Sequence, residues 1–273
     1  DYTDSSCPAL LLEPQRTNVI DRSEYIGWGT TNVLVTNNDV TSPEGVVNAA
    51  KLERNAAGGY ISRNVSLSGD QTYSVFLKKG DLNFGRILAL GTGNPNVYFD
   101  LENGSVGTAT NATGSIKNYG NGWYRCTIVF NITTTAVRVY PTENDASTGG
   151  ASGNIYAWGA QLEAGSYPTS YIPTYGTSVT RNADDCSKTS VSSLLNDSEG
   201  TLFLEVKGIS DGGDSRRLSI SDGTTNNRVI IEIDEIAGRI KAFMSSGGNT
   251  TGTLTSSGNV QTDTNKIAVT YTA

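Results

Sequence analysis

Short runs of alternating apolar and polar residues recur along the chain, and clusters of glycine, asparagine and aspartate separate them. A two-residue period places successive side chains on opposite faces of a strand, whereas a helix needs apolar residues about every 3.6 positions. The helical period is nearly absent, and only residues 45–53 would also allow a turn of helix. The pattern therefore predicts an all-β protein built as a sandwich or a barrel.

Strands are predicted where this alternation is clear and turn signals such as Asn121-Gly122 bound it. Their ranges are Thr72–Lys78, Gly85–Leu90, Asn96–Leu101, Ser115–Asn118, Trp123–Phe130, Ala136–Tyr140 and Asn154–Leu162. Apolar residues of one parity on these strands should pack together. We expect a single core that contains Val97, Phe99, Cys126, Ile128, Val137, Val139 and Trp158.

The segment 155–174 is typical of a closing strand followed by an extended arm. Its first half, Ile155–Leu162, keeps the two-residue alternation. Pro168 and Pro173 then end the pairing, because proline has no backbone N–H to donate. The tyrosine-rich arm, residues 167–175, either packs back over its own domain or forms the lip of a binding site.

Several motifs in the first two thirds of the chain point to one family. They are Cys7–Asn18, Gly122–Cys126, Ile155–Thr174 and Val179–Cys186. Together they resemble a jelly-roll module common in bacteriophage tail-fibre, head-fibre and spike proteins, which is akin to carbohydrate-binding modules. The resemblance covers most of residues 1–190 and implies a jelly-roll β-sandwich.

A second β pattern follows a polar stretch. Its predicted strands are Glu199–Lys207, Arg217–Ser221, Arg228–Asp234, Arg239–Met244 and Lys266–Thr272. They resemble the first half of a concanavalin-like, laminin-G-type lectin sandwich, so we expect further strands after Ala273 and, from the first motif, further sequence before Asp1. The predicted organisation is a jelly-roll module at 1–183, a linker at 184–189 and part of a second, concanavalin-like β-sandwich at 190–273.

The composition excludes several function classes. The net charge of −7 and the isoelectric point of about 4.7 argue against nucleic acid as a partner. The chain has no histidine, which excludes Ser-His-Asp and Cys-His catalysis as well as histidine-ligated zinc. No stretch of sequence is apolar and long enough for a membrane-spanning helix, so membrane insertion is not expected.

The chain has three cysteines. Cys126 alternates with Tyr124 and Ile128, which places it in the predicted core as a small apolar residue. Cys7 and Cys186 flank the first module, and the termini of a sandwich often meet. They are either joined by a disulfide or free.

The chemistry that fits the outward-facing residues is sugar recognition, in which aromatic rings cover C–H faces and planar polar groups bind hydroxyls. Strand parity directs a set of aromatic and cationic side chains away from the predicted core. The candidate glycan-binding residues are Tyr98, Trp123, Arg125, Arg138 and Tyr140. We expect them to share one exposed sheet face as a shallow groove; the alternative is that they pack on a loop or a neighbouring subunit.

The one cofactor that these motifs suggest is a structural calcium ion. Sugar-binding jelly rolls often hold Ca²⁺ near their first and last strands, and this ion needs six to eight oxygen ligands. The oxygen-bearing candidates are Glu13, Asn18, Gln161 and Glu163. The alternative for Glu13 is an ion pair with Arg16.

Glu232-Ile-Asp-Glu235 is similar to the acidic strand motif of concanavalin-like glycoside hydrolases. On a strand, Glu235 falls on the face opposite Glu232, so the two carboxylates cannot act on one glycosidic bond. We interpret the segment as an acidic edge strand and predict no enzymatic activity.

These observations favour a non-catalytic virion fibre or decoration protein that binds host-surface glycans. The expected partners are a cell-surface or capsular polysaccharide, other virion subunits and further copies of the chain, as a trimer in a fibre; the expected location is the virion surface or the extracellular space. Two alternatives remain: an accessory module of a secreted polysaccharide-degrading enzyme, and a purely structural capsid or tail decoration domain.

Overall fold

The computed structural model describes residues 10–150, 152–196, 198–207, 216–234, 239–256 and 264–272. Most of these residues lie in strands, and the one helical element among them is a short 3-10 turn, η1 (Ser192–Leu194). The prediction of an all-β protein is confirmed. The chain divides into two compact units between Asp184 and Asp185, and each unit is described by itself.

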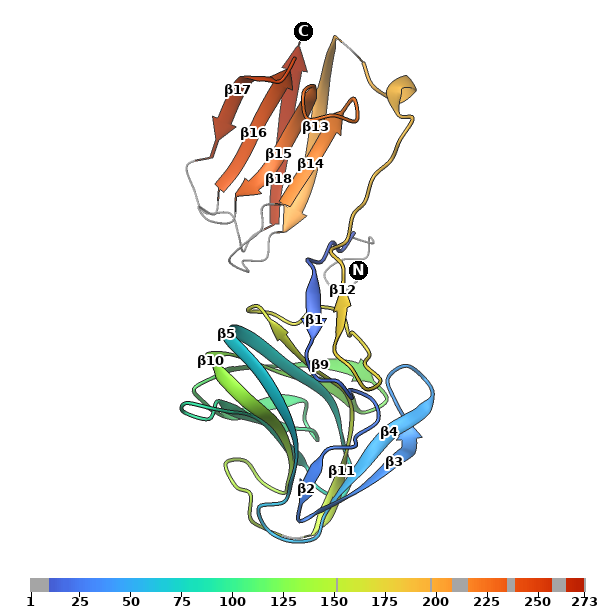
Figure 1. Ribbon diagram of the computed structural model, residues 1–273, viewed down its shortest axis with the longest axis vertical. Coiled ribbons are helices and arrows are strands. Elements are labelled where there is room, and N and C mark those ends of the chain that lie inside the picture. The colour runs from blue at the N-terminus through green and yellow to red at the C-terminus, as the bar shows by residue number, and fades with distance from the viewer. Residues whose placement is uncertain are drawn as a thin grey trace. The chain divides into compact units, whose positions relative to one another are not determined.

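The first unit contains strands β1 to β12 (Figure 1). Their bounds are β1 (Arg16–Asn18), β2 (Gly29–Thr31), β3 (Val33–Thr41), β4 (Val47–Arg54), β5 (Tyr60–Lys79), β6 (Phe84–Leu90), β7 (Asn96–Asp100), β8 (Ser105–Thr110), β9 (Thr113–Gly120), β10 (Trp123–Thr142), β11 (Gly153–Ala164) and β12 (Val179–Arg181). Residues 45–53, where a helical turn was the alternative, belong largely to β4 and are extended.

Two long strands, β5 and β10, organise the sandwich, because they pair antiparallel along almost their whole length. At one end of the pair, β11, β4 and β3 continue from β5, and β9 flanks β10. At the other end, β2 flanks β5, and β6, β7 and β8 continue from β10. We call the first set sheet I (β3-β4-β11-β5-β10-β9) and the second set sheet II (β2-β5-β10-β6-β7-β8). Both long strands therefore run from sheet I into sheet II (Figure 1).

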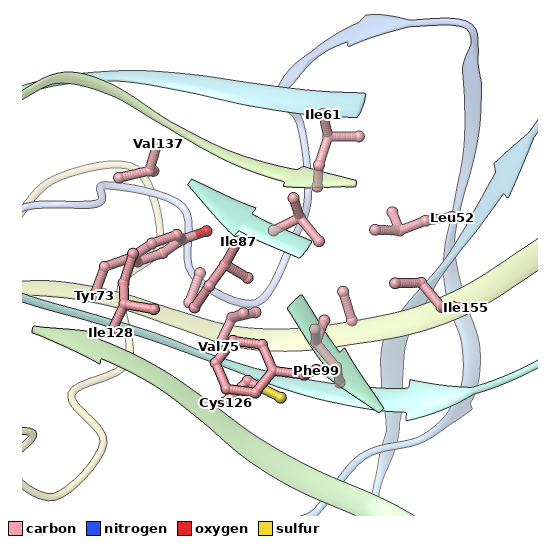
Figure 2. Close-up of a cluster of buried hydrophobic side chains, with 14 of the residues drawn as sticks. Leu52, Ile61, Tyr73, Val75, Ile87, Phe99, Cys126, Ile128, Val137 and Ile155 are labelled. Carbon is pink, nitrogen blue, oxygen red and sulfur yellow. The ribbon is translucent and has the colours of Figure 1, made fainter. Parts of the chain in front are cut away.

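The apolar inner faces of the two sheets enclose the main core (Figure 2). Cys126 and Ile128 enter it from the sheet I part of β10, and Val137 and Val139 enter it from the sheet II part. One strand thus lines both walls of the core, with a bulge between Thr134 and Ala136. The predicted core residues Val97, Phe99, Cys126, Ile128, Val137 and Val139 all belong to this cluster.

Trp158 is buried as predicted, but it is not part of the main core. The pairing of β11 with β5 shifts register between Trp158 and Gln161, and Gly159 at the bulge has a φ of +64°. A Cβ at Gly159 would lie only 2.9 Å from the Phe76 ring, so both the conformation and the space require glycine. The bulge interrupts the alternation, and Trp158 faces outward between core residues Ala157 and Ala160.

A short ribbon closes the first unit, in which β1 pairs antiparallel with β12. Thr17 and Thr180 face each other across it, with their hydroxyl oxygens 2.7 Å apart. The ribbon brings the beginning and the end of the unit together, as expected for a sandwich. Cys186 is exposed, whereas Cys7 lies outside the described residues, so the disulfide between them stays a prediction.

The second unit contains a two-stranded sheet, β13–β18, and a four-stranded sheet, β14–β15–β16–β17. The bounds are β13 (Glu199–Lys207), β14 (Arg216–Ser221), β15 (Arg228–Asp234), β16 (Arg239–Ser246), β17 (Asn249–Thr255) and β18 (Thr264–Thr272). The sequence pattern missed β17, because its threonines and glycine give no apolar alternation. The interpretation of β15 as an edge strand is wrong, since it pairs with β14 on one side and β16 on the other.

Candidate functional site

The five predicted glycan-binding residues do not share one face. Trp123 and Arg125 point outward from sheet I, whereas Tyr98, Arg138 and Tyr140 point outward from sheet II. Because β10 contributes its first half to one sheet and its second half to the other, outward parity on the two halves means opposite sides of the sandwich. The expectation of a single exposed groove is therefore wrong.

On sheet I the predicted residues are covered. Trp123 is only 1% exposed, and its indole Nε1 donates to the carbonyl oxygen of Thr41 at 3.0 Å. Arg125 is 7% exposed, and its guanidinium donates to the Thr169 carbonyl at 2.8 Å and to the Ser74 hydroxyl at 3.0 Å. Both side chains serve packing, which was the stated alternative to sugar binding.

The cover over sheet I is the chain's own arm, residues 167–175. The Tyr171 ring lies 4.6 Å from the Trp158 ring and 6.1 Å from the Phe76 ring. Its hydroxyl lies 2.6 Å from the Ser23 Oγ. Of the two expectations for the arm, packing over its own domain is confirmed for Tyr171.

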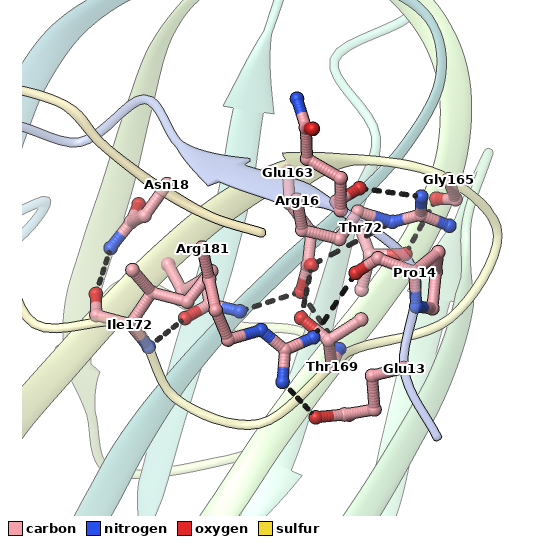
Figure 3. Close-up of polar contacts among 12 residues, drawn as sticks. Glu13, Pro14, Arg16, Asn18, Thr72, Glu163, Gly165, Thr169, Ile172 and Arg181 are labelled. Atoms are coloured by element: carbon pink, nitrogen blue, oxygen red, sulfur yellow. Dashed lines mark hydrogen bonds and ion pairs between the residues drawn. The ribbon is translucent and has the colours of Figure 1, made fainter. Parts of the chain in front are cut away.

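A buried polar network fixes this arm (Figure 3). Glu163 is fully buried, and its two oxygens accept hydrogen bonds from the Thr169 N–H at 3.0 Å and the Thr169 hydroxyl at 2.6 Å. Gln161 Oε1 accepts from the Ile172 N–H at 2.7 Å, and Asn18 Nδ2 donates to the Ile172 carbonyl at 2.9 Å. These side chains satisfy backbone groups of residues 169–172, a part of the arm that belongs to no strand.

The proposed calcium ligands all lie in or beside this network: Glu13, Asn18, Gln161 and Glu163. Glu13 accepts from the Ser170 N–H at 2.7 Å and pairs with Arg181 rather than with Arg16. Their oxygens face N–H donors and a guanidinium, which leaves little of the oxygen shell that Ca²⁺ needs. In the described part of the chain no three Asp, Glu, Cys or His side chains gather to hold a metal ion. The geometry favours an arm anchor over a metal centre.

Sheet II presents a different arrangement, which we call the Arg–Tyr cluster: Tyr60, Arg86, Tyr98, Arg138 and Tyr140. Arg86 lies directly opposite Tyr98 on β7 and Tyr140 on β10. Its guanidinium carbon lies 5.3 Å from the Tyr98 ring centre and 4.9 Å from that of Tyr140. Arg138 lies 4.3 Å from the Tyr60 ring centre, and Tyr60 and Tyr140 are 5.1 Å apart. The cluster is a row of alternating rings and cations across four strands.

The rings of this cluster support the arginines instead of being open to a sugar. Tyr98 and Tyr140 are each 6% exposed, which contradicts their predicted role as exposed stacking platforms. Burial raises the pKa of Tyr98, and the nearby Arg86 partly offsets this. The phenol is therefore neutral at physiological pH and adds no negative charge to the cluster.

The two guanidiniums are half-buried. Arg86 Nε donates to Asn96 Oδ1 at 2.9 Å, and Arg138 Nη1 donates to the Tyr140 hydroxyl at 3.2 Å. Within the described ranges neither forms an ion pair with a carboxylate, and the Arg138 Nε is buried without a hydrogen-bond partner. Stacked, partly desolvated guanidiniums with free N–H groups are suited to bind a planar anion such as a carboxylate.

Arg86 and Tyr60 were not among the glycan-binding residues predicted from the sequence. Arg86 alternates with the core residues Ile87 and Ala89, so the parity argument used for Arg138 would have found it. Tyr60 opens β5, where serine, asparagine and glycine weaken the strand pattern over Tyr60–Asp70. Its role depends on the pairing of β5 with β10, which is a long-range contact.

Glu232, the first residue of the acidic motif in the second unit, forms an ion pair. Glu232 is buried, and its Oε2 accepts a hydrogen bond from the Arg217 Nε at 2.6 Å. Glu235 lies outside the described residues, so the predicted separation of the two carboxylates stays a prediction.

No helix in the described ranges has the length and apolar character needed to cross a bilayer. Comparison with known proteins gives no family model and no curated protein that matches the chain. A function is therefore best sought in the geometry of the Arg–Tyr cluster.

Proposed function

We propose that the first unit is a non-catalytic module that binds an acidic glycan through the Arg–Tyr cluster. The observation that carries the proposal is the pair of half-buried arginines, Arg86 and Arg138, stacked on tyrosine rings without a carboxylate partner among the described residues. Removing a cation from water without a partner is costly, so a ligand that brings an anion is favoured there.

Binding at this cluster would depend on local hydrogen bonds and not on the overall charge of the chain. The chain carries a net charge of −7, so an acidic polymer is not drawn to the molecule as a whole. Recognition must then come from local, directional hydrogen bonds between the guanidiniums and a carboxylate or sulfate of the glycan. Weak binding at one site would be multiplied in a fibre with several copies, without any new contact.

The setting that we propose for this activity is a virion fibre or decoration protein at the virion surface, where the acidic glycan belongs to the host cell and the chain acts without cleaving it. Its other partners there are further virion subunits and further copies of the chain. This setting follows from the resemblance of the sequence motifs, and the Arg–Tyr cluster supports only the binding chemistry.

Isothermal titration calorimetry with acidic polysaccharides tests the proposal. Alginate, hyaluronan and a sulfated galactan serve as probes, with neutral dextran as the reference. We expect binding of at least one acidic probe, weaker at high salt because the contact is ionic. Arg86→Gln and Arg138→Gln should each weaken it by about tenfold or more, as for a lost charged hydrogen bond.

Arg63→Gln is the matched control, because it removes the same charge from an arginine that already pairs with Asp21 on the same unit. It should leave the affinity within about twofold of the wild type. Unchanged binding in both cluster variants, with circular dichroism spectra like the wild type, would remove the Arg–Tyr cluster from any role in recognition.

A further inference from the structure

We propose a second ligand site on the first unit, a pocket that takes one or two neutral sugar residues. The pocket has a volume of about 400 Å³ and lies at the sheet I end of the first unit, between the end of β3 and the turn before β10. Its polar lining includes Asp39, Ser42, Lys78 and Asn121, and its apolar lining is Val40 and Val47. It shares no residue with the Arg–Tyr cluster, so either site can exist without the other.

The β3–β4 turn builds one wall of the pocket. The Ser42 N–H donates to the Val46 carbonyl at 2.8 Å, and the Gly45 N–H donates to the Ser42 carbonyl at 3.1 Å. Gly45 has a φ of +91°, a conformation that a side chain would strain. The Thr41 carbonyl accepts the Trp123 indole N–H at 3.0 Å, which ties this wall to β10. The pocket is therefore formed before a ligand arrives.

The opposite wall is made by Lys78 and Asn121. Lys78 lies on β5 between Trp123 on one neighbouring strand and Tyr156 on the other. Its stem passes Gly122, where a Cβ would lie 3.4 Å from the lysine Cε. Asn121 has a φ of +52°, as the tight turn into β10 requires, and this turn holds its amide at the rim.

The donors and acceptors in the pocket match a sugar. Lys78 offers only donors and forms no ion pair with another described residue. Asp39 offers only acceptors, and the amide of Asn121 offers both. Ser42 is 4% exposed, and its hydroxyl finds no hydrogen-bond partner in the described part of the chain. Such a mixture pairs with the neighbouring hydroxyls of a sugar ring, while the valines cover its C–H face.

The charge of the pocket sets its ligand apart from that of the Arg–Tyr cluster. One carboxylate, Asp39, and one ammonium, Lys78, line the same space and together carry no net charge. A neutral polyhydroxylated ligand can use both groups as hydrogen-bond partners, whereas an acidic sugar would gain an attraction to Lys78 and lose it to the repulsion from Asp39. The two sites therefore suit different residues of a glycan.

Nuclear magnetic resonance of the whole chain tests this site. The chain has three tryptophans, so its indole N–H signals are few, and Trp28→Phe and Trp158→Phe assign the signal of Trp123. The probes are glucose, galactose, N-acetylglucosamine and the disaccharides cellobiose, lactose and chitobiose. We expect a saturable shift of the Trp123 indole signal with at least one probe.

Lys78→Met and Asp39→Asn should weaken that binding by about tenfold, because each removes one charged hydrogen bond. Lys117→Met, on the exposed edge strand β9, and Arg138→Gln should leave it unchanged. The loss of acidic-glycan binding in Arg138→Gln alone would then separate the two sites. Absence of a saturable Trp123 shift with every probe overturns the pocket proposal, as does wild-type affinity in both pocket variants whose indole spectra show an intact fold.

Discussion

The outer faces of sheets I and II look alike in the sequence and differ in the structure. Each carries aromatic and arginine side chains that alternate with core residues. On sheet I the arm of residues 167–175 covers Arg125 and Trp158, the end of β3 bonds the Trp123 indole, and all three side chains are buried. On sheet II Arg86 and Arg138 keep part of their surface in solvent. Strand parity thus tells which face a residue is on, but a distant segment decides whether that face is open.

The largest expected effect is on the covered face. Trp158→Ala should lower the free energy of unfolding by about 3–5 kcal/mol, because the indole is buried between Phe76 and Tyr171. Urea denaturation followed by circular dichroism measures this. Tyr119→Ala is the control, since this ring also contacts Phe76 but is 44% exposed, and it should cost about 1 kcal/mol or less. Equal costs for the two variants would mean that the arm does not seal sheet I.

The anchor of the arm gives the next effect. Glu163→Ala should cost about 2–3 kcal/mol of unfolding free energy, because the Thr169 N–H and hydroxyl lose a charged acceptor in a buried site. Glu53→Ala, which removes a half-exposed carboxylate paired with Lys51, should cost less than about 1 kcal/mol. Equal and small costs for the two variants would show that the hydrogen bonds of Glu163 do not hold the arm.

A pair of arginine variants compares the two faces directly. Arg125→Gln should lower the unfolding free energy by about 1.5–3 kcal/mol, since its buried guanidinium bonds the Thr169 carbonyl and the Ser74 hydroxyl. Arg138→Gln should cost about 1 kcal/mol or less, the value of a partly exposed contact with the Tyr60 ring. Urea midpoints of the two variants measure the difference. The reverse order would show that sheet II, not sheet I, uses its arginine for stability.

The smallest effect concerns pH. Burial raises the pKa of the Glu24 carboxyl, although hydrogen bonds from Tyr175, Tyr171 and Asn48 oppose this. The folded state therefore holds this proton more tightly than the unfolded state, and the contribution of Glu24 to stability falls as pH rises through the two pKa values. Urea denaturation of Glu24→Gln and of the wild type, between about pH 4 and pH 7, should show the variant gaining in relative stability with rising pH. A constant difference across this window would contradict the burial of a charged Glu24 beneath the arm.

The local pattern was sufficient for the main core. Cys126 and Ile128 follow from alternation on one predicted strand and Val137 and Val139 from alternation on the next, and all four are buried together. The structure joins the two predicted strands into the single strand β10. Trp158 did not follow, because the bulge at Gly159 interrupts the alternation and places Trp158 on the other face.

The candidate sites depended on longer-range information. The separation of Trp123 from Tyr140 arises because β10 takes part in both sheets, and pairing partners cannot be read from one strand. Asp39, Lys78 and Asn121 line one pocket because the β3–β4 turn lies beside β5 and the turn before β10, and this placement is a long-range feature. Glu13, Gln161 and Glu163 were predicted as metal ligands near the ends of the module, and in the structure they contact the arm and Arg181.

The β1–β12 ribbon has a mechanical consequence. Because its strands are antiparallel, the chain enters and leaves the first unit at the same end of the ribbon. Tension between residues 13 and 184 would break the ribbon contacts one after another. The contacts of Glu13 with Asp184 and Arg181 would break first, and the strand pairs from Arg16 to Asn18 would follow in turn. Apart from the hydrogen bond between Glu13 and the Ser170 N–H of the arm, the sandwich would carry little of that force until the ribbon had opened. A pulled chain would lengthen at this ribbon while the Arg–Tyr cluster and the pocket beside the β3–β4 turn kept their shape.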